Sequence, residues 1–112
     1  MVGYNRRFSS LATKIKDEIK SSLEPKVVNI RVNAGFLEKE HWIQNPNVGG
    51  GRIIGEICHF VDLAQFFTGS KPVNVSAVSI NSENAELTPN DNINITITFQ
   101  NGSIANIMYL AN

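Results

Sequence analysis

The feature that most restricts the fold of this chain is segment 92–110, where a cleanly alternating stretch over 92–100 leads through Asn101-Gly102 into a second strand-like stretch over 103–110. Alternation of apolar and polar residues predicts a strand with one buried and one outward face. Asn-Gly is the dipeptide most typical of a tight turn between antiparallel strands. The segment therefore predicts a β-hairpin with strands over 92–100 and 103–110. In the first strand, we expect the inward face to consist of Ile93, Ile95, Ile97 and Phe99. The outward face would consist of Asn94, Thr96 and Thr98.

Two further strands are predicted from shorter alternating stretches. Residues 26–33 place three β-branched side chains on one face: Val28, Ile30 and Val32. Residues 73–80 also alternate, but the phase shifts near Ala77-Val78, which predicts a β-bulge there.

A helix is predicted after Ser9 or Ser10, since a hydroxyl at the cap position accepts a free backbone N–H. Apolar residues then recur every four positions, which indicates one apolar stripe on an otherwise solvated helix. We expect Pro25 to end the helix. The stripe consists of Leu11, Ile15, Ile19 and Leu23.

A second helix is predicted over Arg52 to Thr68, with Gly69 as its left-handed cap. Its apolar residues are too many for a surface helix, so we expect it to be buried on most sides. The segment before it, 34–51, contains an Asn-Pro pair and three consecutive glycines and predicts a long loop.

The order helix, strand, loop, helix and three strands predicts an α+β fold, with a mainly antiparallel sheet and helices packed on one face. A length of 112 residues suits one domain, 1–112.

The composition excludes several classes of function. Ten Lys and Arg balance ten Asp and Glu, so no net charge attracts the chain to nucleic acid or to a membrane surface. No apolar run is long enough to span a bilayer, and the first residues contain no apolar signal region. The single Cys58 excludes an internal disulfide and a Cys-rich zinc site. A cytoplasmic domain without a metal is therefore expected.

Three polar residues of the second helix carry the candidate chemistry. Arg52, Glu56 and His59 have the spacing i, i+4, i+7, which puts them on one narrow face. On so apolar a helix, they form either a satisfied buried network or the wall of a polar pocket. Histidine is the residue type that exchanges protons near neutral pH. Glu56-x-x-His59 is also half of a di-iron pattern, but the second half is missing.

Two other features have alternative interpretations. Gly49-Gly50-Gly51 precedes a helix and could hold an anion, but the pattern G-x-G-x-x-G is not met, so a flexible, closely packed helix start is favoured. Trp42, beside His41, could line a pocket, although a lone tryptophan is more often part of a core.

The chain resembles the glucose–fructose oxidoreductase / inositol dehydrogenase / MocA family, and most closely its C-terminal domain. The likeness covers nearly the whole chain. The segments that carry it are Val2-Gly3-Tyr4-Asn5-Arg6-Arg7-Phe8, His41-Trp42-Ile43-Gln44-Asn45-Pro46 and Gly49-Gly50-Gly51-Arg52-Ile53-Ile54-Gly55-Glu56-Ile57-Cys58-His59-Phe60-Val61-Asp62.

The resemblance implies a substrate-binding and assembly domain of an NAD(P)-dependent dehydrogenase acting on a sugar, cyclitol or sugar nucleotide. His59 matches the family histidine that contacts the reacting hydroxyl and assists proton transfer. Many members have an acid four positions earlier, where this chain has Gly55; Glu56 is the nearest acid. Asp62 matches a downstream acid, interpreted as structural or as orienting the histidine. Residues that match positions near the pocket or the domain junction are Arg6, Arg7, Trp42 and Arg52.

The family's Rossmann domain, with its catalytic lysine and glycine-rich turn, is absent from these 112 residues. The resemblance therefore implies a truncated C-terminal domain. NAD or NADP would be held by the Rossmann domain of the same polypeptide, and we expect this chain alone neither to bind it tightly nor to turn over substrate. A homo-oligomer formed through the sheet is also expected.

Two alternatives remain open at this point. A non-catalytic module could use an exposed sheet for self-association or for binding a partner, because unpaired strand edges favour pairing with another chain. A hydrolase using Glu56 and His59 is less favoured, because a nucleophile in a pattern such as G-x-S-x-G is missing.

Overall fold

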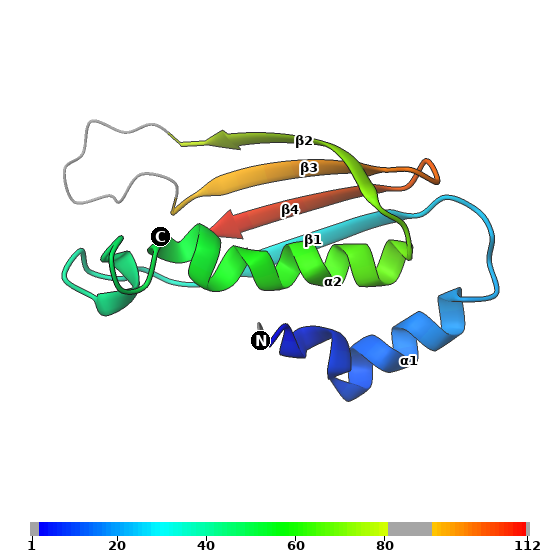
Figure 1. Ribbon diagram of the computed structural model, residues 1–112, viewed down its shortest axis with the longest axis horizontal. Helices are drawn as coiled ribbons and strands as arrows, with labels where there is room; N and C mark the ends of the chain where they lie inside the picture. Colours follow the sequence, from blue (N-terminus) through cyan, green and yellow to red (C-terminus); the bar gives the residue numbers. More distant parts are fainter. Residues whose placement is uncertain (1–2, 81–90, 112) are drawn as a thin grey trace.

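The computed structural model describes residues 3–80 and 91–111, which form a four-stranded sheet with one long helix along it (Figure 1). The strand order is β1-β4-β3-β2. The α+β prediction is confirmed. The elements are η1 (Asn5–Phe8), α1 (Ser10–Ile19), β1 (Val27–Asn33), η2 (Trp42–Gln44), η3 (Ile53–Ile57), α2 (Cys58–Thr68), β2 (Pro72–Ser79), β3 (Ile93–Phe99) and β4 (Ile104–Leu110).

The predicted hairpin joins β3 and β4. Its loop closes with hydrogen bonds from Phe99 N to Ser103 O and from Gly102 N to Phe99 O, each 2.9 Å. Gly102 has φ 83°, a conformation that favours glycine, as expected for a three-residue hairpin loop. β2 pairs antiparallel with β3, whereas β1 is an edge strand that pairs parallel with β4.

The core lies between the sheet and the helix. As predicted, β3 buries its apolar face, and β1 packs Val28, Ile30 and Val32 against the core. The inward side chains of β4 are almost fully buried: Ala105, Ile107 and Tyr109. From the helix, Ile57, Phe60 and Ala64 complete this core.

The second predicted helix is present, but its first part, Ile53–Ile57, is a π-helix rather than an α-helix. Gly69 adopts φ 65° and ends α2 as expected. The prediction that this helix is buried on most sides is confirmed for α2, where Gln65 is the one exposed residue, but not for the π-helical start, where Ile53 and Ile54 are exposed. These two side chains line an open cavity that β2 and β3 border on the other side.

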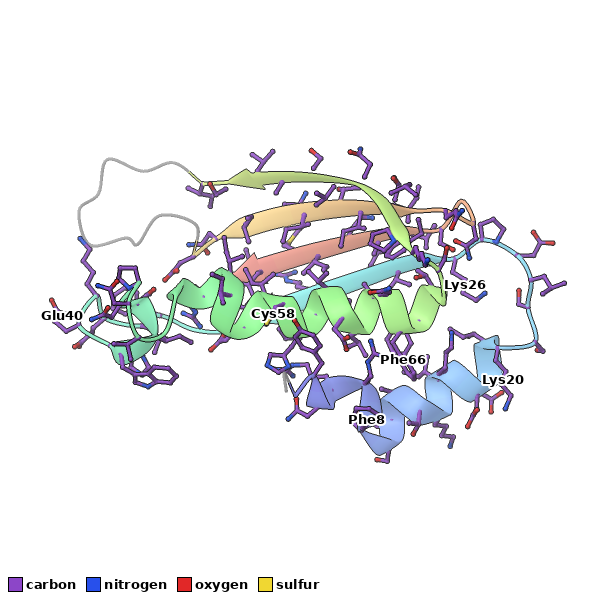
Figure 2. The ribbon with its side chains drawn as sticks, in the orientation of Figure 1. Phe8, Lys20, Lys26, Glu40, Cys58 and Phe66 are labelled. Carbon is purple, nitrogen blue, oxygen red and sulfur yellow. The ribbon has the colours of Figure 1, made fainter. Side chains whose placement is uncertain are left out.

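The apolar stripe predicted for the first helix does not face the molecule. Ser9 caps α1 by accepting from Ala12 N, but the helix ends at Ile19, before Leu23. Leu11 is 73% exposed. Instead, Ala12, which is buried, and Lys16, which is half-buried, face α2. The Lys16 ammonium donates to Phe67 O at 3.3 Å. Figure 2 shows Phe66 between the two helices.

The bulge lies elsewhere than predicted. The β2–β3 register is continuous through Ala77 and Val78 and shifts between Pro72 and Asn74 instead. The apparent phase change has a simple cause: seven of the eight β2 residues are exposed, so burial does not constrain the alternation. Among the described residues, no helix has the length and hydropathy needed to cross a membrane.

Candidate functional site

A cavity of about 590 Å³ lies where η1, the edge strand β1 and the start of the long helix meet. This volume is within the usual range for small-molecule sites. Glu56 and His59 both belong to its lining, so the helix brings these two predicted residues to one cavity. The remaining lining residues are Asn5, Arg6, Arg31, Val32, Asn33, Ala34, Gly55 and Phe60.

Glu56 is held by two buried side chains. Arg52, 2% exposed, donates from Nε to the Tyr109 hydroxyl at 2.8 Å and from Nη1 to Gly35 O at 2.7 Å. Its Nη2 lies 3.5 Å from the Glu56 carboxylate, and Tyr109 donates its hydroxyl to the same carboxylate. Burial, followed by the hydrogen bond to Glu56, raises the pKa of Tyr109, which keeps its hydroxyl protonated as a donor.

His59 has a different environment. Its Nδ1 is shielded from solvent and has no hydrogen-bond partner among the residues that the structure describes. The ring meets that of Tyr4 edge to face, with centroids 5.6 Å apart. A buried polar atom without a partner costs about 1–3 kcal/mol. The described fold therefore leaves part of the imidazole's hydrogen-bonding capacity unused beside the cavity.

Three side-chain contacts hold the segment before α1 against the long helix. Besides Tyr4 on His59, the Arg6 guanidinium lies 4.2 Å from the Phe60 ring centroid. Arg7 forms a two-pronged ion pair with Asp62, with Nε donating at 2.8 Å, and this hydrogen bond raises the pKa of Arg7. These contacts hold residues 4–7 against the side of the long helix that carries His59.

At Gly55, where the family resemblance led us to expect an acid, the space that a side chain would need is occupied by Ile43. A Cβ at Gly55 would lie 2.9 Å from Ile43 Cδ1 and 3.1 Å from Ile43 Cγ1. An acidic side chain at this position would require Ile43, which is buried, to move. The next residue, Glu56, supplies the carboxylate of the cavity instead.

The glycine run before the helix serves packing. A Cβ at Gly49 would lie 2.3 Å from Ile43 Cα, so only glycine fits against that backbone. Gly50 and Gly51 adopt φ 73° and 83°. The contact at Gly49 therefore favours the packing interpretation of this run over an anion site. Within ranges 3–80 and 91–111, no three His, Cys, Asp or Glu residues converge on a possible metal site either.

The other predicted site residues lie apart from the cavity lining. Trp42 is 62% exposed and contacts the His41 ring, so the core interpretation is wrong. Asp62 is paired with Arg7 and does not orient His59. Arg52 is buried inside its network with Glu56 and Tyr109.

Tyr109 and Tyr4, which contact Glu56 and His59, were not predicted as site residues. The inward register of β4 was a usable signal for Tyr109, since a buried tyrosine hydroxyl needs a polar partner.

The profile described as GFO/IDH/MocA C-terminal domain matches residues 23–110. No curated protein sequence matches the chain.

Solved structures match it along nearly its whole length. A myo-inositol dehydrogenase from Corynebacterium glutamicum is 24% identical, with a TM-score of 0.74 over 100% of this chain and 34% of its own. An aldose-aldose oxidoreductase from Caulobacter crescentus, complexed with glycerol, is 22% identical, with a TM-score of 0.77 over 98% and 34%. An NAD-binding protein from Listeria innocua is 26% identical, with a TM-score of 0.76 over 99% and 33%. The chain thus spans about a third of the length of the solved structures it matches.

Proposed function

Because this chain belongs to the GFO/IDH/MocA family, as a C-terminal domain, we propose that it forms the substrate side of an NAD(P)-dependent oxidoreductase. The proposed substrate is an alcohol of a sugar, a cyclitol or a sugar nucleotide. The observation that carries this proposal is the cavity that Glu56 and His59 line together. Similar structures include enzymes described as acting on myo-inositol and on aldoses, which supports a polyol in that cavity.

In this proposal, His59 accepts the proton of the reacting hydroxyl. Its Nδ1 is shielded from solvent and has no partner among the described residues, so a reorientation of the ring would present this nitrogen to a substrate and satisfy a group that the fold does not. Glu56 accepts a hydrogen bond from a neighbouring substrate hydroxyl. Arg52 and Tyr109 keep its carboxylate in place and already use one of its oxygens. Arg6 and Arg31 line the same cavity, while Arg7 and Asp62 act indirectly by fixing η1 on α2.

NAD or NADP is assigned to a separate dinucleotide-binding domain of the same protein. The family model that matches this chain is that of the C-terminal domain, which supports this assignment, and the proton-handling roles above concern residues of this chain alone. Domain 1–112 then contributes substrate positioning and proton exchange.

The proposal is tested by NMR of the imidazole signals, since the chain has two histidines. His41 lies beside Trp42 outside the cavity lining and is the internal control. Adding myo-inositol, glucose, glucuronate or a nucleotide sugar at millimolar concentration should shift the His59 signals and leave those of His41 unchanged. If no member of this panel shifts His59, the proposed site is wrong.

Turnover gives a second test in a protein that joins this domain to a dinucleotide-binding domain. His59→Ala should lower kcat by about 10²–10⁴-fold, the usual contribution of a positioned acid or base. The matched variant His41→Ala should leave kcat unchanged. Equal kcat in the His59 variant and the parent would remove His59 from the proton transfer.

A second candidate function is self-association through the sheet. It is favoured by β2, an edge strand exposed along most of its length, with Val73, Val75 and Val78 each more than half exposed. Such an edge can pair with another chain. Sedimentation velocity at increasing concentration tests it: a concentration-dependent dimer supports this function, and a monomer throughout contradicts it.

A further inference from the structure

The end of strand β1 lines the cavity with four consecutive residues: Arg31, Val32, Asn33 and Ala34. Successive side chains of a strand point to opposite faces of the sheet, so four in a row cannot all point into one cavity. Val32 packs toward the core, whereas Arg31 and Asn33 have the opposite parity and direct their side chains to the other sheet face. β1 therefore lines the cavity with the main chain of its edge.

The register of β1 decides which of its main-chain groups are free. β1 is the outermost strand on its side of the described sheet and pairs with β4. Lys26 O accepts from Ile104 N at 2.9 Å. At the other end, Ala34 N donates to Leu110 O at 2.7 Å. In a parallel pair, every second residue turns its N–H and C=O toward the partner strand. The even-numbered residues of β1 thus bond to β4, and the odd-numbered ones turn both groups outward: Val27, Asn29, Arg31 and Asn33.

The outward main-chain groups of Arg31 and Asn33 receive no hydrogen bond from residues 3–80 and 91–111. Each of the two residues offers one donor and one acceptor to a cavity that Glu56 and His59 line from the helix. A sugar hydroxyl both donates and accepts, so it can bond to either group. The two residues are about 6.6 Å apart along the strand, comparable with the separation of hydroxyls on opposite sides of a six-membered ring.

We propose that the free edge of β1 determines specificity at this site, and that the main-chain N–H and C=O groups of Arg31 and Asn33 bind substrate hydroxyls that do not react. The inference rests on the proposed function and adds binding groups that no side chain provides. His59 takes the reacting hydroxyl and Glu56 its neighbour, while the strand edge binds hydroxyls farther round the ring. Because main-chain groups carry no net charge, the edge selects substrates by the placement of their hydroxyls.

A free strand edge can also pair with an extended peptide. Within the cavity lining, however, the outward residues of the edge are Arg31 and Asn33, and the side chains of Glu56 and His59 share the same space. Two outward residues beside helix side chains give a strand little to pair with, whereas a ring of hydroxyls can bond to both walls. The geometry therefore favours a small polyol.

Amide hydrogen exchange of the 112-residue chain tests the register before any ligand is added. The amides of Arg31 and Asn33 should exchange roughly tenfold or more faster than those of Ile30 and Val32, which donate to β4. If the two pairs are equally protected, the edge is covered and the inference is wrong.

NMR with myo-inositol or glucose at millimolar concentration tests binding. Either compound should shift the amide signals of Arg31 and Asn33 together with the His59 imidazole. Val27 and Asn29 turn outward on the same edge but lie outside the cavity lining, so their amides are internal controls and should not shift.

The outcomes separate this inference from the proposed function. A shift of His59 without the two amides overturns the inference and leaves the proposed function standing. Shifts of the two amides without His59 support the edge and contradict the proposed role of His59. If neither shifts, both proposals fail. An N-acetylated valine–threonine tetrapeptide amide that shifts all four outward amides would identify a peptide-binding edge and also overturn the inference.

Asn33→Pro removes one outward N–H without breaking a bond to β4, and proline is tolerated at such edge positions. It should lower the affinity for myo-inositol by roughly three- to tenfold, the contribution of one neutral hydrogen bond. Val27→Pro removes an outward N–H of the same strand outside the cavity lining and is the matched control. Unchanged affinity in Asn33→Pro, or an equal loss in both variants, contradicts the inference. If Asn33→Pro does not fold, the amide shifts of the parent chain decide.

Discussion

Glu56 and His59 lie about one turn apart on the same helix and line the same cavity, but the fold treats them differently. Glu56 accepts from Tyr109 and is paired with Arg52, two residues that are almost fully buried. His59 has a buried Nδ1 without a partner among the described residues. A polar group that the protein itself satisfies contributes to stability, whereas a buried one left unsatisfied costs stability.

The largest expected effect is on the Glu56 side. Arg52→Met should lower the free energy of unfolding by about 3–5 kcal/mol, because it leaves the Tyr109 hydroxyl, the Gly35 carbonyl and the Glu56 carboxylate without their buried partner. Urea denaturation followed by circular dichroism measures this. A loss below about 1 kcal/mol would mean that solvent replaces Arg52 and that Glu56 is no better satisfied than His59.

Tyr109→Phe should have a smaller effect, a loss of about 1–3 kcal/mol, since one hydroxyl is removed while the ring packing remains. The same denaturation experiment measures it. Phe60→Leu is a useful comparison, since it changes the adjacent ring packing without removing a hydrogen bond. A Tyr109 variant as stable as the parent would contradict a structural role for the hydroxyl.

The raised pKa of Tyr109 also predicts a dependence on alkaline pH. In the unfolded chain tyrosine loses its proton near pH 10, whereas the folded state retains it. Above about pH 10 the unfolded state binds fewer protons, so stability falls as pH rises, by up to about 1.4 kcal/mol per pH unit. Tyr109→Phe should flatten this decline. Parallel pH profiles of parent and variant would show that the folded state does not retain the proton.

The smallest effect on stability is expected at His59. His59→Leu should change the free energy of unfolding by less than about 0.5 kcal/mol or increase it, because the variant removes a polar atom that has no described partner. A loss above about 2 kcal/mol would indicate that His59 is a structural residue like Arg52 and would remove the contrast between the two positions.

Local patterns predicted most of the fold. The alternation in β3, the Asn-Gly hairpin and the caps at Ser9 and Gly69 are confirmed, because each depends on interactions between residues near one another in sequence. The wrong predictions concern which face of a helix or strand packs against the rest of the molecule. The stripe of α1 was assigned correctly as apolar, but the small Ala12 allows a closer approach to α2 than Leu11 does.

For the site, too, local contacts were predicted and long-range contacts were not. Spacing along the helix predicted that Arg52, Glu56 and His59 share a face, and Arg52 and Glu56 are in contact. It did not predict that Asp62 binds Arg7, 55 residues away, or that Tyr109 enters the network. Contacts between residues so far apart in sequence leave no periodic signal.

By itself, the sequence determined the elements, the hairpin and the polar face of the long helix, because these follow from the periodicity of side chains along a helix or strand. Only the tertiary structure decided that Tyr109 and Arg52 satisfy Glu56 and that His59 lines an open cavity with its Nδ1 unpartnered among the described residues. Which polar group gains a partner depends on how strand β4 and segment η1 pack against the helix, and distances between remote segments are set by packing rather than by local pattern.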